Sequence, residues 1–157
     1  MEHSVHLSLP DNLSLDFPDP VFIKRAMRIL LMAMSEDSGI KYELSVSVIG
    51  DEEIRNLNRE YRKKDLPTDV LSFSMLEGDE MPSAGDKVML GDIVISYETC
   101  AEQAMRVGHS VRDEFLRLAT HGLLHIFGYD HELSEKEEKR MKEKEDELLD
   151  ILQESGL

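Results

Sequence analysis

Hydrophobic and polar positions alternate in four short stretches of the chain and recur at helical spacing in five others. In the second of the alternating stretches, Leu44, Val46 and Val48 fall on one face, which is typical of a half-buried strand. Ser134 with Glu137 three residues later forms a capping box, which predicts the start of the last helix. We predict strands at 5–9, 43–49, 69–73 and 88–95, and helices at 21–34, 51–61, 97–107, 111–127 and 135–153. The pattern predicts an α+β fold, in which four strands form one sheet, with the first strand at an edge, packed with about five helices.

Length and composition define the class of protein. The 157 residues are close to the usual size of one unit, so we expect a single domain over residues 1–157. A lone cysteine, Cys100, excludes an intramolecular disulfide and a cysteine-based zinc cage, and fits a reducing compartment. The N-terminus lacks the features of a signal peptide, and no apolar run reaches the ~18 residues of a membrane span. We therefore expect a soluble, cytoplasmic protein without a membrane partner.

Charge is distributed unevenly along the chain. The net charge of −15 argues against a protein that coats nucleic acid nonspecifically, and DNA is not expected as a partner. Residues 55–64 nevertheless carry five cations and one anion, whereas residues 132–157 carry ten acids and five bases. The acidic end is typical of a solvated helix face. The basic stretch is open to either interpretation, a solvated face or a binding surface. Residues 77–86 hold two glycines, a proline and several acids, so we expect this loop to be the least ordered internal segment.

The most informative segment contains three closely spaced histidines. His121 and His125 lie four residues apart in a predicted helix, so their imidazoles project from the same face, one turn apart. Gly128 allows the chain to turn back after the helix, so that His131 can supply a third nitrogen. Three imidazole nitrogens with a fourth position left for water describe a catalytic zinc site. The other histidines lack such partners and are interpreted as surface or core residues; they are His3, His6 and His109.

The histidine spacing also matches that of the metzincin metalloproteases, and Gly122 is where the chain departs from them. Zinc proteases of this kind need a glutamate next to the first histidine as general base. Glycine has no side chain that could act as a general base. The chain therefore keeps the histidine spacing of these proteases but lacks the residue that their peptidase chemistry needs.

Three blocks of sequence carry motifs that resemble one known family. They read HGLLHIFGYDH at 121–131, LNREYRKKDLPTDVLSF at 57–73 and LGDI at 90–93. Together they resemble the YbeY family of bacterial single-strand-specific metallo-endoribonucleases, and the resemblance covers residues 45–150. The first 40 residues add little to it.

The resemblance implies a zincin-like α+β fold with one mixed four-stranded sheet. It implies one zinc ion on His121, His125 and His131, and an important arginine at Arg62. It also implies single-strand-specific RNA cleavage in 16S rRNA 3′-end maturation and ribosome quality control. The expected partners are ribosomal RNA and the ribosome or its proteins.

The residues offer compatible chemistry and leave alternatives open. A metal-activated water could attack phosphorus, while the Arg62 guanidinium holds the phosphate and offsets charge in the transition state. Arg62 would then lie on the wall of the cleft that faces the histidines; alternatively, it is a surface residue or pairs with Asp69. A general base is not obvious, and the candidates for a supporting or proton-transfer role are Asp92, Asp130 and Glu98. The alternative functions are a metzincin-like metallopeptidase and a non-catalytic zinc-containing factor whose acidic surface docks a basic ribosomal protein.

Overall fold

The computed structural model describes residues 3–36, 38–76, 85–130 and 134–157. Nine elements follow one another along the chain: β1 (Ser4–Ser8), α1 (Pro20–Ser35), β2 (Lys41–Ile49), α2 (Asp51–Arg62), β3 (Val70–Ser74), β4 (Lys87–Ser96), α3 (Tyr97–Val107), α4 (Val111–Ile126) and α5 (Glu135–Glu154). All nine lie within two residues of the ranges predicted from hydrophobic periodicity. Residues 77–84 of the loop that was expected to be the least ordered lie outside the described residues, so this expectation stays a prediction.

The strands form one mixed sheet in the order β1-β2-β4-β3. β1 pairs with β2 and β2 with β4 in parallel, whereas β3 runs antiparallel to β4. The α+β fold with a four-stranded mixed sheet is therefore confirmed, and β1 is an edge strand as expected. β3 forms the other edge, so one side of its backbone faces away from the sheet.

Side chains cap the starts of four helices, including that of Ser134, whose capping role the sequence predicted. Asp19, Ser96, Ser110 and Ser134 each accept a hydrogen bond from a backbone N–H three residues later, at 2.8, 3.2, 3.0 and 3.1 Å. Such caps satisfy backbone donors that the first turn of a helix leaves without partners. The helices α1, α3, α4 and α5 therefore begin where the capping residues place them.

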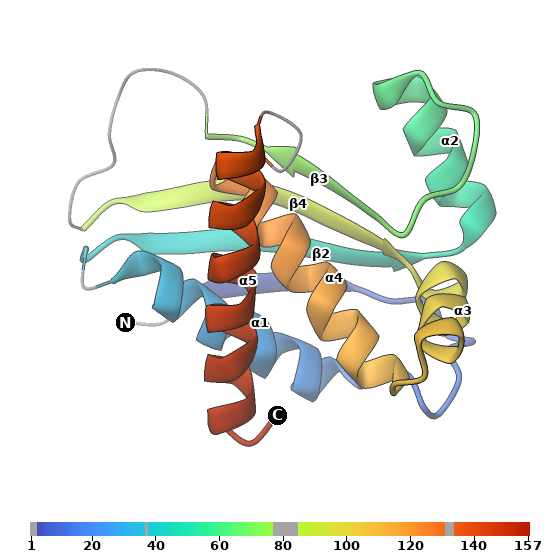
Figure 1. The fold of residues 1–157 in the computed structure, drawn as a ribbon, viewed down its shortest axis with the longest axis horizontal. Coiled ribbons are helices and arrows are strands. Elements are labelled where there is room, and N and C mark those ends of the chain that lie inside the picture. The colour runs from blue at the N-terminus through green and yellow to red at the C-terminus, as the bar shows by residue number, and fades with distance from the viewer. Residues whose placement is uncertain (1–2, 37, 77–84, 131–133) are drawn as a thin grey trace.

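The two faces of the sheet are covered differently. Helices α1, α4 and α5 lie together on one face (Figure 1), where the main core contains Leu44, Val46 and Ile93 from the strands. On the other face, α2 packs Ile54 against Val94 in a much smaller apolar cluster. The main core thus fixes α4 against the sheet, while α2 lies on the opposite face near β3. Among the described helices none is long and apolar enough to cross a membrane.

Gly122 lets α4 approach the sheet closely. A Cβ atom at this buried position would lie 3.2 Å from Ile93 Cγ2 and 3.3 Å from Val70 Cγ2, both tighter than ordinary van der Waals contact. Ile93 and Val70 belong to β4 and β3, so the last two turns of α4 rest on the strands at this edge of the sheet. The close packing brings His121 and His125, on either side of Gly122, next to β3.

Candidate active site

The two histidines of α4 bring their ring nitrogens together. His121 Nε2 and His125 Nε2 are 3.1 Å apart, and both side chains are only partly exposed. Two nitrogens bound to one tetrahedral zinc at about 2.0–2.1 Å lie about 3.3 Å from each other. The observed separation and the chemistry of the two imidazoles therefore fit a shared metal ion. His131, the third predicted ligand, lies outside the described residues, and within the described ranges no three metal-binding side chains form a complete site.

A buried carboxylate contacts the first histidine from another helix. Glu145 Oε2 on α5 lies 3.4 Å from His121 Nδ1, the ring nitrogen that faces away from His125. Sequence reasoning missed this residue, although the sequence contains an indication of it. Along α5 the buried positions are Met141, Glu145, Leu148 and Leu152, so an acidic residue occupies one position of an otherwise apolar stripe. A glutamate at a core position needs a partner, and here the partner is His121.

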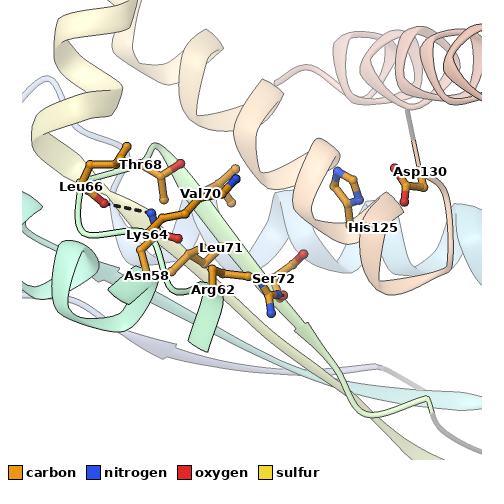
Figure 2. A pocket seen from close by; sticks show the side chains of 10 residues that line it. All are labelled: Asn58, Arg62, Lys64, Leu66, Thr68, Val70, Leu71, Ser72, His125 and Asp130. Carbon is orange, nitrogen blue, oxygen red and sulfur yellow. Dashed lines mark hydrogen bonds between the residues drawn. The ribbon is translucent and has the colours of Figure 1, made fainter. Parts of the chain in front are cut away.

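One pocket contains both His125 and Arg62. It has a volume of about 400 Å³ and lies between β3, the chain that follows α2, and the end of α4 (Figure 2). Its lining residues are Asn58, Arg62, Lys64, Leu66, Thr68, Val70, Leu71, Ser72, His125 and Asp130. The structure thus places Arg62 on the wall of the pocket shared with a predicted metal ligand, although 63 positions separate Arg62 from His125 in the chain.

The Arg62 guanidinium is held at the outer edge of β3. Its Nη2 donates a hydrogen bond to the carbonyl of Ser72 at 2.7 Å, and its Cζ lies 5.0 Å from the centroid of the Phe73 ring. A guanidinium has five N–H donors, and the contact with Ser72 uses one of them. The side chain is exposed, so it is oriented by the strand and accessible from the pocket. Asp69, the alternative partner, instead accepts a hydrogen bond from Gln103 at 3.1 Å.

Four of the five cations of the basic stretch form two groups. Arg55 Nε and Nη2 donate to the two carboxylate oxygens of Asp65 at 2.9 and 3.3 Å, and Arg59 Nη1 lies 3.8 Å from the same carboxylate. The hydrogen bond from Arg55 lowers the pKa of Asp65. Asp65 therefore offsets part of the charge of Arg55 and Arg59, whereas Arg62 and Lys64 line the pocket.

The three acids considered for a supporting role have different positions. Asp130 lines the pocket together with His125. Glu98 accepts a hydrogen bond from the backbone N–H of Asp51 at 2.9 Å, so it caps the start of α2. Asp92 lies on β4 between Gly91 and Ile93, and strand alternation directs it to the face opposite α4. Only Asp130 of these three is placed near the histidine pair.

A second polar cluster lies at the start of α4, around Glu114. The Glu114 carboxylate is fully buried and hydrogen-bonds to Arg117 and Gln103, with Gln103 Nε2 at 3.3 Å. His109 Nε2 lies 2.6 Å from it, so this histidine is a network member rather than a simple surface or core residue. Burial raises the pKa of Glu114, but the hydrogen bonds from Arg117 and His109 outweigh burial and leave the pKa below its ordinary value. The Glu114 hydrogen bond in turn raises the pKa of Arg117, and the charges of Asp69 and Glu145 add to this effect.

Glu114→Gln should lower the free energy of unfolding by about 2–3 kcal/mol at pH 7, because the hydrogen bonds to charged partners would be weakened in a buried site. A depressed folded-state pKa stabilises the protein above the unfolded-state pKa, and this contribution is lost as pH falls through the folded value. Urea titrations from pH 7 to pH 3 should show a shallower acid-induced loss for the variant. Glu102→Gln, at an exposed pair with Arg106, should change stability by less than about 0.5 kcal/mol. Equal effects of both substitutions would contradict the prediction.

Cys100 is not a candidate nucleophile. The thiol is fully buried, and burial raises its pKa to about 12. Because the thiolate is the reactive form, this cysteine is inert at neutral pH.

The fold and the pocket define a hydrolase-like α+β protein, in which one imidazole of the histidine pair, that of His125, shares a cavity with the cationic side chains of Arg62 and Lys64. Comparison with known proteins agrees with this class. The family model described as Endoribonuclease YbeY matches residues 16–153, and the chain belongs to this family. It is 50% identical to the endoribonuclease YbeY of Halalkalibacterium halodurans over 113 residues, which are 69% of this chain and 70% of that protein.

Other relatives extend the similarity to most of the chain. The endoribonuclease YbeY of Leptospira interrogans is 45% identical over 140 residues, covering 81% of this chain and 99% of that protein. The Leptospira biflexa protein of the same name is 42% identical over 147 residues, covering 94% and 92%. The solution structure of TM1509 from Thermotoga maritima shares the fold, with a TM-score of 0.60, 24% identity, and coverage of 94% of this chain and 87% of that one.

Proposed function

We propose that this protein is a zinc-dependent endoribonuclease that cleaves single-stranded RNA. In this proposal it acts in the cytoplasm on the 3′ end of 16S rRNA and in ribosome quality control, with the ribosome or ribosomal proteins as partners. Membership of the Endoribonuclease YbeY family supports a hydrolase that acts on RNA. The observation that carries the proposal is the pocket that Arg62 and Lys64 share with His125.

The predicted metal ligands fit the proposed zinc ion. His121 and His125 would hold it through Nε2, since these two nitrogens converge, and His131 is the third proposed ligand. A bound zinc ion supplies a Lewis acid and lowers the pKa of a water molecule towards neutrality. The imidazoles must be neutral to bind metal, so protonation in acid should weaken zinc binding.

The cationic side chains of the pocket would bind and orient the phosphodiester. The Arg62 guanidinium is fixed by Ser72 and Phe73 and keeps donors available for two phosphate oxygens. Charge grows on those oxygens in the transition state, so a preorganised guanidinium stabilises that state more than the ground state. Lys64 adds a second positive charge on the same wall.

The overall charge favours a short unpaired strand over a duplex as substrate. Nonspecific binding to nucleic acid depends on many phosphate contacts, and a net charge of −15 opposes such binding. Attraction to phosphate is concentrated instead at the few cations around one pocket. One flexible strand can enter such a pocket, whereas a duplex would spread its phosphates over the acidic remainder of the surface.

Replacement of Arg62 tests the proposal. Arg62→Ala should reduce the cleavage rate of a single-stranded RNA oligonucleotide by about 10²–10³-fold, as expected for the loss of one transition-state hydrogen-bond donor. Arg62→Lys should recover little activity, because an ammonium ion cannot replace the planar guanidinium. Rates would be measured with zinc-loaded protein, and zinc content and melting temperature should remain at wild-type values.

Arg59→Ala is the matched control, since Arg59 lies three positions earlier on α2 and faces Asp65 rather than the pocket. It should retain cleavage within about threefold, an estimate based on the small energies of exposed ion pairs. Cleavage by Arg62→Ala at the wild-type rate would favour the alternative of a non-catalytic ribosome-associated factor.

A further inference from the structure

Glu145 is the buried acidic residue of α5, a helix whose charged side chains are mostly exposed. Most charged residues of α5 are exposed, whereas Glu145 is 7% exposed and shares the buried stripe with Met141 and Leu148. A carboxylate buried among apolar side chains is costly unless a hydrogen-bond partner compensates for it. Its position in the core of the α4–α5 contact therefore indicates a specific role toward α4.

The partner of this carboxylate is one nitrogen of His121, whose other nitrogen faces His125. The distances are 3.4 Å from Glu145 Oε2 to His121 Nδ1 and 3.1 Å between the two Nε2 atoms. A carboxylate only accepts hydrogen bonds, so its partner nitrogen must carry a proton. In a neutral imidazole the proton on Nδ1 leaves a lone pair on Nε2.

We infer that Glu145 is a positioning residue that fixes the His121 tautomer and ring orientation, so that Nε2 is presented to a metal ion. The inference rests on the proposed metal site and adds to it a residue outside the ligand set. A carboxylate behind a ligating histidine also raises the basicity of the imidazole, and loss of such a partner typically costs 10–100-fold in metal affinity. Glu145 does not contact the substrate in this assignment, and it acts through His121.

The helix pairing makes this contact rigid. Glu145 comes from α5, 24 positions after His121, and the two helices are held together by the main core, which includes Leu118, Met141 and Leu148. Rotation of the His121 ring would bring carbon rather than Nδ1 to the carboxylate and lose this hydrogen bond, leaving Glu145 with the longer-range attraction of the Arg117 charge. The tautomer is therefore set by tertiary packing rather than by the local sequence around the histidines.

The test uses the Glu145→Gln and Glu145→Ala variants of the 157-residue chain, with Glu147→Gln as the matched control. Glu147 lies on the same helix, is exposed and pairs with Lys144 at 3.2 Å, so its replacement removes a carboxylate without affecting His121. Imidazole ¹⁵N shifts of the zinc-free proteins, at a pH where histidine is neutral, report the tautomer. Zinc affinity is measured separately by competition with a chromophoric chelator.

Wild-type protein and Glu147→Gln should show His121 protonated on Nδ1 and equal zinc affinities within twofold. Glu145→Ala should show a mixture of tautomers and a 10–100-fold weaker affinity. Glu145→Gln keeps an acceptor oxygen on a side chain of nearly the same shape, so its tautomer population and zinc affinity should lie between those of the wild type and Glu145→Ala. If the alanine variant does not fold, the comparison of Glu145→Gln with the wild type decides the test. An unchanged His121 tautomer together with unchanged zinc affinity in the Glu145 variants would overturn the inference. Failure of the wild type to bind zinc would instead overturn the proposed function, and the tautomer comparison would still decide the role of Glu145.

Discussion

His125→Ala is expected to abolish high-affinity zinc binding and to reduce RNA cleavage by about 10³-fold or more. Its Nε2 atom lies 3.1 Å from that of His121, so the substitution removes one of two converging nitrogens and leaves the proposed metal ion without half of the observed donor pair. The several kcal/mol that a metal ion contributes to a hydrolytic transition state would be lost with it. Zinc per chain by elemental analysis and cleavage of an RNA oligonucleotide measure the two effects.

Folding should survive this substitution. His125 is half-buried on the pocket side of α4, and the main core is built from other positions of the helix, such as Leu123 and Leu124. The melting temperature of the zinc-free protein should therefore change little. His6→Ala, at an exposed position of the edge strand β1, is the matched control and should keep wild-type zinc content and activity. Full zinc occupancy in His125→Ala would contradict the assignment of the histidine pair as metal ligands.

The secondary structure could be predicted from the sequence because local features determine it. The capping residues Asp19, Ser110 and Ser134 precede clear helical periodicity, and Leu44, Val46 and Val48 alternate along β2 and are buried as expected. The strand order was not predictable in the same way. The pairing of β4 between β2 and β3 depends on contacts between distant segments, which periodicity does not contain.

The candidate site was predictable only in part. The four-residue spacing of His121 and His125 fixes their common helix face, so their convergence follows from helical geometry. Glu145 was missed because its contact with His121 depends on the packing of α5 against α4. The sequence also did not indicate which cations of the basic stretch would face the pocket. Asp65, which follows the stretch immediately in the chain, forms ion pairs with Arg55 and Arg59.

Gly122 separates the proposed nuclease from the peptidase alternative by packing as well as by chemistry. The glycine faces the sheet, where Ile93 and Val70 leave no room even for a Cβ atom at ordinary contact distance. A glutamate at this position of α4 would therefore be directed into the core between the helix and the strands. The short helix-to-sheet distance in this protein therefore opposes a catalytic glutamate next to the first histidine.

Gly122→Glu should consequently destabilise the fold by more than about 4 kcal/mol, because it overpacks the core and buries a charge without a partner. Gly122→Ala is the graded control: its Cβ overpacks the contact with Ile93 and Val70, but alanine gains about 1 kcal/mol of helix propensity over glycine. The free energy of unfolding of the alanine variant should fall by no more than about 2 kcal/mol. Urea unfolding followed by circular dichroism measures both, and the glutamate variant is expected to show little folded protein at 37 °C. A Gly122→Glu protein with wild-type stability would mean that α4 can move away from the sheet, and the structural objection to a peptidase-like site would then disappear.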